Sequence, residues 1–230
     1  MIKQFMEDAR LIAERDPAAR SVAEVVLLYS GFHAVCLHRV AHWFYNRKLY
    51  FIARLISQWG RFWTGIEIHP GAKIGKGLFI DHGMGVVIGE TAEIGDNCTI
   101  YHNVTLGGTG KDRGKRHPTI GNNVLISTGA KVLGPFKVGD NSRIGANAVV
   151  LSEVEPNTTV VGVPGRAVKR DGQKLMPSVE LDQIHIPDPV AQELCKMCRR
   201  VERLEKELAA GQGALTEDKA NTGEVFDKRE

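Results

Sequence analysis

Residues 66–106 read IEIHPGAKIGKGLFIDHGMGVVIGETAEIGDNCTIYHNVTL, and this stretch decides the fold. Within it an aliphatic residue recurs every six positions and is often followed by glycine and a short polar run. Neither the 3.6-residue period of a helix nor the two-residue period of an ordinary strand keeps apolar positions to one residue in six. With one slip and one longer break the series runs through Ile68, Ile74, Ile80, Ile88, Ile94, Ile100, Leu106, Ile120, Ile126, Val132, Val138, Ile144 and Val150.

A six-residue period is typical of a solenoid of short parallel strands. Each hexad supplies one flat strand and one turn, three hexads close a triangular coil, and the aliphatic side chain points toward the axis. The stacked coils then bury one continuous core. The sequence holds 25 glycines, several of which follow the inward residue at a corner, where the backbone needs room or a positive φ. These are Gly75, Gly89, Gly95, Gly121, Gly139 and Gly145.

Outside the repeat the pattern changes at both ends. Residues 1–63 show helical spacing, so we expect an N-terminal α-helical domain ahead of a solenoid domain at 64–170. Asp16-Pro17 predicts the start of a helix, with Asp as the cap and Pro at the first helical position. Residues 171–230 are interpreted as a linker, a short coiled-coil-like helix at about 190–208 and a disordered polar tail.

Composition limits the classes of function. The net charge is +3 and no basic block as large as a molecular face occurs, so we do not expect nucleic-acid binding. The most apolar run, 22–40, contains charged residues and indicates a buried helix and no membrane span. The four cysteines are scattered without a signal peptide, which predicts a cytoplasmic protein. Cys195 and Cys198 form a CxxC with no second pair, so we do not expect zinc there.

The two departures from the six-residue period are the candidate sites, because insertions in a solenoid collect on its surface. The first surrounds Asp81-His82-Gly83. Imidazole titrates near neutral pH, so His82 is the candidate acid–base group. Glu67 stands fifteen residues earlier, close to one coil of about eighteen residues, and can form a carboxylate–imidazole dyad with His82. The competing interpretations are a solvated turn histidine and an exposed edge glutamate.

The second departure is the loop GGTGKDRGKRHPT at residues 107–119. Its glycines let backbone N–H groups approach a ligand, and its lysines and arginines add positive charge, so it suits an anionic partner. A mobile solvated loop is the alternative. The loop lacks both the GK[ST] of a Walker A loop and the strand–turn–helix setting of a dinucleotide-binding fingerprint.

The opening stretch, continued by the loop GGTG…RHPTIG and by GANAVVL and GVPGRAVK, closely resembles bacterial serine O-acetyltransferase, a family of the hexapeptide-repeat acyltransferases. The resemblance spans roughly residues 10–170, and the segments RDPAARSV and GFHAV fit the helical domain of that family. It implies an α+β fold, in which an α-helical domain precedes a left-handed parallel β-helix and a C-terminal helix and tail follow it.

The resemblance implies roles for individual residues. His82 matches the catalytic base, and Glu67 matches its acidic partner, at a position where the family often has Asp. The residues that match serine-binding positions are Asp81, Arg116, His117 and Asp16, which offer an arginine for the α-carboxylate and carboxylates for the α-ammonium. The residues that match the CoA channel are Gly108, Thr109, Thr128, Arg143 and Ala146, with Thr128 where Ala is common.

The activity so implied is transfer of an acetyl group from acetyl-CoA to the hydroxyl of L-serine, with no metal. The family implies a homotrimer, with a dimer of trimers as the alternative, and L-cysteine as a feedback inhibitor in the serine pocket. Some members insert an Ile-ended tail into cysteine synthase. This sequence ends at Asp227-Lys228-Arg229-Glu230, so we do not expect that complex.

Three other functions compete with this one. A transferase of the same fold can act on a sugar or antibiotic alcohol, although the RHP of the loop disfavours it. A γ-type carbonic anhydrase is a β-helix with a zinc ion on three histidines, for which His82, His102 and His117 are the candidates. A non-catalytic scaffold is the third. Turnover with different alcohols and metal analysis distinguish them.

Overall fold

The computed structural model describes residues 2–110, 113–168, 197–198, 200–201 and 203–204. The chain separates into two units, Met1–Pro187 and Asp188–Glu230. The six described residues of the second unit are helical, and the rest of the predicted segment at 190–208, including Cys195, lies outside the described residues. In the described part of the chain, no helix is long and apolar enough to cross a membrane.

Four helices form the start of the first unit. The bounds of the second and third differ from two predictions made from the sequence. The helices are α1 (Ile2–Arg15), α2 (Val22–Leu28), α3 (Ser30–Asn46) and α4 (Tyr50–Thr64). Asp16-Pro17 begins no helix, because Ser21 takes that role and accepts a hydrogen bond from the N–H of Glu24 at 3.1 Å. The apolar run 22–40 is also not one helix, since Tyr29 has extended backbone and separates α2 from α3.

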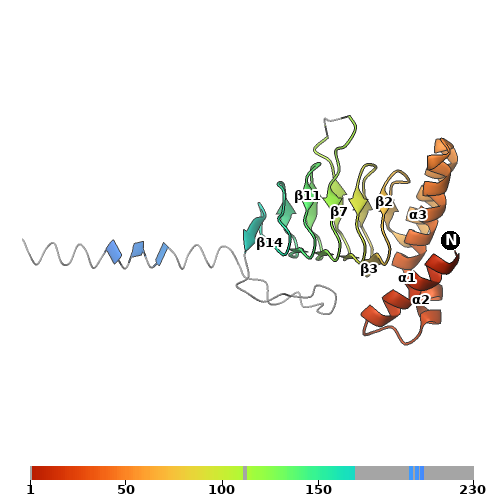
Figure 1. Cartoon of the computed structure of the whole chain (residues 1–230), viewed down its shortest axis with the longest axis horizontal. Coiled ribbons are helices and arrows are strands. Elements are labelled where there is room, and N and C mark those ends of the chain that lie inside the picture. Colours follow the sequence, from red (N-terminus) through yellow and green to blue (C-terminus); the bar gives the residue numbers. More distant parts are fainter. Residues whose placement is uncertain (1, 111–112, 169–196, 199, 202, 205–230) are drawn as a thin grey trace, which may run out of the picture. The chain divides into compact units, whose positions relative to one another are not determined.

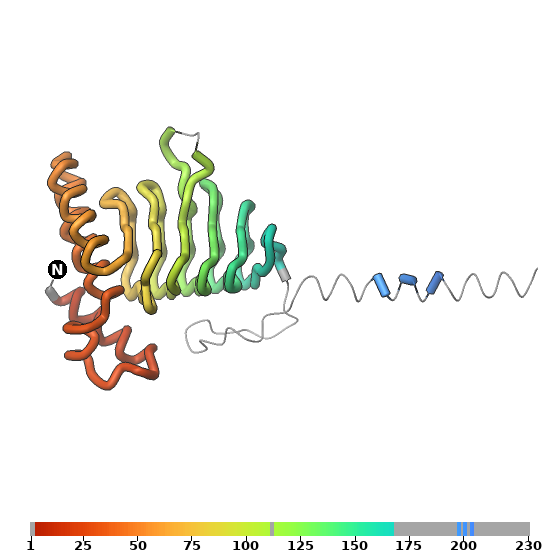
Figure 2. The backbone as a smooth tube through the Cα atoms, turned by 180° about the vertical axis from the view of Figure 1, so that it is seen from behind, coloured from red at the N-terminus to blue at the C-terminus, as the bar shows by residue number. Residues whose placement is uncertain are grey.

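Very short strands follow, and Figures 1 and 2 show them stacked as successive coils beside the helices. They are β1 (Glu67–Ile68), β2 (Lys73–Ile74), β3 (Phe79–Ile80), β4 (Val87–Ile88), β5 (Glu93–Ile94), β6 (Thr99–Ile100), β7 (Thr105–Gly107), β8 (Thr119–Ile120), β9 (Leu125–Ile126), β10 (Lys131–Leu133), β11 (Lys137–Val138), β12 (Arg143–Ile144), β13 (Val149–Val150), β14 (Thr159–Val161) and β15 (Arg166–Val168).

The strands form three sheets, in which almost every strand pairs with the strand three positions along the chain. Sheet 1 has the order β1-β4-β7-β10-β13, sheet 2 has β2-β5-β8-β11, and sheet 3 has β3-β6-β9-β12-β14-β15. All pairs are parallel except β14 with β15. The pairs hold the hexad residues in register, so that Ile80, Ile100, Ile126 and Ile144 lie in one row. This is the triangular coil that the six-residue period predicts.

The core lies on the axis of the coils. The hexad aliphatics are buried, apart from the half-buried Ile74, and they form one apolar cluster with Ala34 and Val35 of α3. α3 approaches the first coil closely, because a Cβ on Gly31 would overlap the backbone carbonyl of Ile80. The helices therefore pack on the first coil, where the core would otherwise meet water.

The corner glycines are needed for space and not for conformation. Five of the six expected glycines have neighbours that a Cβ would overlap; at Gly95, for instance, the Cβ would lie 2.7 Å from the carbonyl oxygen of Gly121. None of the six has a positive φ. The left-handed conformation falls instead on asparagines at the turns, among them Asn123, Asn141 and Asn157.

Candidate active site

His82 lies on the turn between sheet 3 and sheet 1, directly after β3. Turns of this kind, at residues 81–86, 101–104, 127–130 and 145–148, are called here the His82 corner. His82 has a φ of 58°, and its side chain is 75 % exposed, so its ring is accessible to a substrate. Its Nε2 lies 3.8 Å from Oδ1 of Asp81. Burial raises the pKa of Asp81, and the charge of His82 opposes that rise.

The register of sheet 3 places four residues at equivalent points of this corner. Each stands two positions after an aligned isoleucine, in the order His82, His102, Thr128 and Ala146. The rings of His82 and His102 are 5.9 Å apart between centroids. Backbone hydrogen bonds continue the column, from Gly129 N–H to the His102 carbonyl at 3.0 Å and from Asn147 N–H to the Thr128 carbonyl at 2.8 Å.

The column brings together residues expected to have different roles. Thr128 and Ala146, expected in the CoA channel, lie on the same corner as His82, and Arg143 begins β12 just before Ala146. Reasoning from the sequence gave His102 no place in an acyltransferase. The two-residue slip in the hexad series was the signal that placed it one coil from His82.

Asp16 reaches the same corner from the helical part of the chain. It follows α1, accepts hydrogen bonds from the phenol of Tyr29 at 2.6 Å and from the N–H of Ala18 at 2.8 Å, and its charge contributes to the raised pKa of Asp81. Burial, the hydrogen bond to Asp16 and nearby negative charge raise the pKa of Tyr29. Tyr29 was not expected from the sequence, because helical spacing alone made it a packing residue.

Glu67 lies on β1 and is held by the last helix. Arg61 Nη1 lies 3.1 Å from Oε2 of Glu67, and Arg54 Nη2 lies 3.6 Å from Oε1. Among the described residues, Glu67 makes no hydrogen bond or ion pair with His82. The suggested dyad of Glu67 and His82 therefore stays a prediction, whereas Oδ1 of Asp81 lies 3.8 Å from Nε2 of His82.

Arg116 and His117 lie at a different corner, where sheet 1 turns into sheet 2. Turns of this kind, at residues 69–72, 89–92 and 108–118, are called here the Arg116 corner. The loop 107–119 rises from it above the coils (Figure 2), and Lys111 and Asp112 of this loop lie outside the described residues. Gly108 and Thr109 begin the loop. A Cβ on Gly108 would come within 3.0 Å of the Arg116 carbonyl oxygen, so glycine permits that approach.

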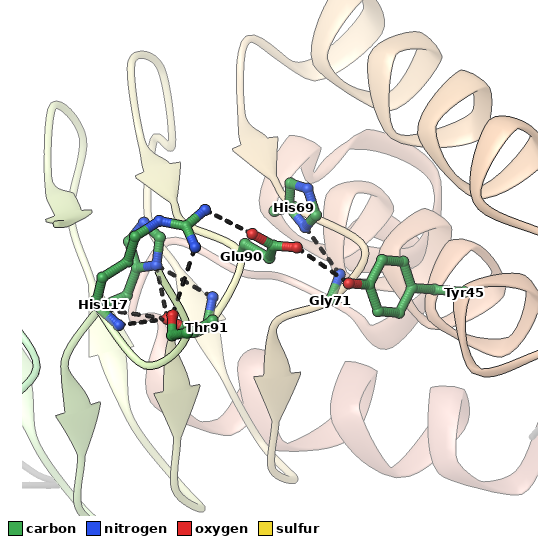
Figure 3. Close-up of polar contacts among 8 residues, drawn as sticks. Tyr45, His69, Gly71, Glu90, Thr91 and His117 are labelled. Carbon is green, nitrogen blue, oxygen red and sulfur yellow. Dashed lines mark hydrogen bonds and ion pairs between the residues drawn. The ribbon is translucent and has the colours of Figure 1, made fainter. Parts of the chain in front are cut away.

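A hydrogen-bonded network fixes this corner. Nη2 of Arg116 donates to Oε2 of Glu90 at 2.5 Å, and the phenol of Tyr45 donates to Oε1 of Glu90 at 3.1 Å. The bond from Arg116 is the main cause that lowers the pKa of Glu90. Figure 3 shows Glu90 between Tyr45 and the Thr91–His117 pair. A surface cavity of about 320 Å³ adjoins the network and is lined by Tyr45, Gly71, Lys73, Glu90, Thr91, Ala92, Glu93, Gly114 and Lys115.

His117 is buried beside Thr91. The N–H of Thr91 donates to Nδ1 of His117 at 3.1 Å, and the Thr91 hydroxyl lies 2.9 Å from the same nitrogen. Burial and the charge of Arg116 lower the pKa of His117. Both effects disfavour the charged form of the His117 ring.

Apart from Glu67 on β1 and Arg143 on β12, the expected site residues thus form two groups. Asp16, Asp81, His82, Thr128 and Ala146 belong to the His82 corner, whereas Gly108, Thr109, Arg116 and His117 belong to the Arg116 corner. The two groups therefore lie at different corners of the triangular coil. Within the described residues, no cluster of three or more His, Cys, Asp or Glu side chains could hold a metal ion.

A three-sided coil of hexads, with a histidine at one corner and an extruded basic loop at the next, defines a hexapeptide-repeat transferase. Residues 117–152 match the family described as bacterial transferase hexapeptide (six repeats). The serine acetyltransferase of Staphylococcus aureus (strain Mu50) is 58 % identical over 203 residues, which are 88 % of this chain and 94 % of that protein. The chain belongs to the serine acetyltransferase family, and it is an enzyme.

Solved structures agree with this assignment. A serine acetyltransferase in complex with cysteine has a TM-score of 0.77 and 38 % identity, covering 80 % of this chain and 72 % of that one. The serine acetyltransferase of Brucella abortus strain S19 in complex with coenzyme A has a TM-score of 0.72 and 44 % identity, covering 74 % of this chain and 68 % of that one. At this level of identity the fold and the family are shared.

Proposed function

We propose that the chain transfers the acetyl group of acetyl-CoA to the hydroxyl of L-serine, giving O-acetyl-L-serine and CoA for cysteine biosynthesis, with His82 as the general base. The observation that carries this proposal is the column of the His82 corner. It places an exposed imidazole in line with Thr128 and Ala146, which match the CoA channel of the family. Of the residues expected to act in the site, His82 is the one with an exposed ring.

The proposed reaction needs only this base and groups that orient the substrates. A neutral His82 takes the proton of the serine hydroxyl as its oxygen attacks the thioester carbon. The tetrahedral intermediate collapses by breaking the carbon–sulfur bond, and His82 returns the proton to the departing thiolate of CoA. General-base help of this kind contributes about 10²- to 10⁴-fold. Backbone N–H groups of the glycine-rich loop are candidates to stabilise the oxyanion.

The serine acceptor is argued from charge. The guanidinium of Arg116 can bind the α-carboxylate at two points, since planar forks match carboxylates well. Asp16 and Asp81 approach each other closely enough for their charges to interact, and they can bind the α-ammonium. L-Cysteine has the same two charged groups, so we propose that it competes in the same pocket, as the known complex of a relative with cysteine supports.

We further propose a left-handed β-helix that assembles as a homotrimer, with each active site shared by two subunits. The separation of the two groups supports this, because in a closed three-fold ring the His82 corner of one subunit can face the Arg116 corner of the next. The exposed aromatics of α4 also support assembly: Phe51, Phe62 and Trp63 are 81 %, 81 % and 71 % exposed. A dimer of trimers remains the alternative.

The division into a helical part at 1–63, a β-helix at 64–170 and a C-terminal segment is kept as part of this proposal, since α4 ends at Thr64 and β1 begins at Glu67. We also place the enzyme in the cytoplasm. Cys36, Cys98 and Cys198 carry free thiols, which suits a reducing compartment.

The test is a thiol-release assay with acetyl-CoA and L-serine, L-homoserine or a sugar alcohol as acceptor. We expect turnover with serine to exceed that with the other alcohols by at least about tenfold, and His82→Ala to lose about 10²-fold or more of kcat while binding acetyl-CoA normally. His33→Gln is the control, because His33 bonds the Val26 carbonyl on the helical part. Near-normal turnover in His82→Ala removes His82 from the mechanism, and preference for a sugar alcohol overturns the acceptor.

A further inference from the structure

Thr91 connects the two residues that are expected to hold serine. Its hydroxyl oxygen accepts hydrogen bonds from the backbone N–H of Arg116 at 3.0 Å and of His117 at 3.1 Å. The Thr91 carbonyl accepts a third from Nζ of Lys115 at 2.8 Å. A single threonine, 25 and 26 residues earlier in the chain, therefore fixes the backbone of the loop where both side chains begin.

The same threonine determines which nitrogen of His117 carries the proton. A backbone N–H can only donate, and the N–H of Thr91 points at Nδ1 of His117, so Nδ1 is the acceptor. The Thr91 hydroxyl has used its lone pairs on two backbone N–H groups, so its proton is free to go to Nδ1 as well. With Nδ1 accepting two bonds, the neutral ring carries its hydrogen on Nε2.

The charges around the ring also favour its neutral form. Arg116 and Lys115 on the loop disfavour a second positive charge, Glu90 on the facing turn opposes them, and His69 one coil away interacts electrostatically with the ring. Within the described residues Nε2 makes no hydrogen bond. A Cβ on Gly89 would overlap the Nε2 side of the ring, so glycine leaves that edge room.

We propose that Thr91 is a positioning residue, which holds His117 as the Nε2-protonated tautomer so that Nε2–H donates a hydrogen bond to an oxygen of the serine substrate. This inference rests on the proposed function, since it takes serine as the ligand of His117. The role of Thr91 goes beyond the proposed function, because Thr91 lies outside both groups of expected site residues. Figure 3 shows Thr91 and His117 facing each other at this corner.

Thr91→Val tests the role with nearly unchanged shape, because valine keeps the backbone N–H and removes the hydroxyl. We expect the KM for serine to rise about tenfold or more and the KM for acetyl-CoA to change less than about twofold. Thr91→Ser retains the hydroxyl and should recover most of the serine affinity. The matched control is Thr99→Val, a half-buried threonine of β6 whose hydroxyl makes no hydrogen bond in the described residues.

Nitrogen NMR of histidine-labelled protein gives a second measurement that a purely structural role would not move. We expect His117, assigned by its loss in His117→Gln, to show an unprotonated Nδ1 and a protonated Nε2. In Thr91→Val the ring should become a mixture of tautomers with a higher pKa, and the acid limb of kcat/KM for serine should move to higher pH. The reason is that hydrogen bonds to Nδ1 stabilise the neutral ring.

The outcomes separate this inference from the proposed function. If the wild type acetylates serine but Thr91→Val equals Thr99→Val in KM for serine and in the His117 signal, the inference is overturned and the function stands. A protonated Nδ1 in the wild type overturns it directly. If the wild type does not use serine, the proposed function fails and with it the donation to serine, while the NMR signal still decides whether Thr91 sets the tautomer. Equal losses of serine and acetyl-CoA affinity also count against it, because they indicate damage to the fold.

Discussion

Asp8 of α1 and Arg39 of α3 form a buried ion pair, with 2.6 Å between Oδ2 and Nη2 and side chains only 4 % and 13 % exposed. The other oxygen of Asp8 accepts a hydrogen bond from the N–H of Gly77 at 3.0 Å. Asp8 therefore links two helices to the turn between β2 and β3. We expect this link to hold the helical part on the first coil.

Replacing Asp8 by alanine should destabilise the protein by about 3–5 kcal/mol, because Arg39 would remain buried without its partner. Denaturant unfolding measures this change. The control is Glu93→Ala, which breaks the exposed pair of Lys73 and Glu93 and should change stability by less than about 1 kcal/mol. Equal small effects from the two substitutions would show that the buried pair does not anchor the helices.

Glu90 should control how Arg116 is presented to a carboxylate. Glu90→Gln keeps the shape but removes the charge that Arg116 Nη2 contacts. We expect the KM for serine to rise about tenfold, since hydrogen bonds between charged groups contribute about 1.5–3 kcal/mol. Tyr45→Phe removes one neutral donor to Glu90 and should have a smaller effect, about fivefold or less. Steady-state kinetics at saturating acetyl-CoA checks both, and a larger effect from Tyr45→Phe would contradict the order.

Gly89→Ala tests whether the position of the His117 ring matters. The added Cβ would overlap the ring, so either the ring or the backbone of the turn must move. We expect kcat/KM for serine to fall by about tenfold or more, with little change in acetyl-CoA binding measured by calorimetry. Gly60→Ala is the comparison, because a Cβ on Gly60 of α4 would make only an ordinary contact with Leu37, at 3.5 Å. Unchanged serine kinetics in Gly89→Ala would show that the ring has no fixed role.

The asparagines at the turns between coils stabilise the stack in two ways. Asn141 has a φ of 58°, accepts a hydrogen bond from Asn123 Nδ2 at 3.2 Å and donates one to Asn157 Oδ1 at 3.1 Å. Asn141→Gly removes the side-chain bonds alone, whereas Asn141→Ala also strains the backbone by about 1–2 kcal/mol. Thermal unfolding should therefore rank wild type above Gly and Gly above Ala. If the alanine variant unfolded at a higher temperature than the glycine variant, the positive φ of Asn141 would not explain the choice of asparagine.

His38 should make stability depend on pH. Burial, aided by His42 and Arg39, lowers the pKa of His38 to about 3 from 6.5. The unfolded chain therefore binds a proton between pH 6.5 and 3 that the folded chain does not bind. The contribution is fully present above pH 6.5 and is lost as pH falls toward 3, by on the order of 1 kcal/mol per pH unit.

Denaturant unfolding at several pH values measures this dependence, and His38→Gln should flatten it by that amount. His33→Gln is the control, because His33 is half-buried on the same helix. Parallel pH profiles for His38→Gln and the wild type would contradict the prediction.

The hexad pattern predicted the solenoid because one physical requirement repeats in it. Each aliphatic residue must point to the axis, and Ile80, Ile100 and Ile126 do so in register. The same register made the neighbourhood of His82 and His102 predictable, since both stand two positions after such a residue. The corner glycines were predicted for a correct reason, space, and for a wrong one, positive φ.

Contacts between turns of different coils could not be predicted from the period. Glu90 and Arg116, or Thr91 and His117, lie 26 residues apart, and no repeat relates their side chains, because the extruded loop returns by its own path. The predicted helix start at Asp16-Pro17 was wrong for another reason. Asp16-Pro17 has the local chemistry of a helix start, but Asp16 is occupied by the phenol of Tyr29, a tertiary contact that local propensity does not contain.

The separation of the two corners has a consequence for mixtures of variants. A chain with His82→Ala still carries an intact Arg116 corner, and a chain with Arg116→Ala still carries an intact His82 corner. If neighbouring chains share sites as proposed, an equal mixture of these two inactive proteins, unfolded and reassembled together, regenerates complete sites at about one junction in four. The mixture therefore regains activity if neighbouring chains share sites. It stays inactive if each chain completes its own site.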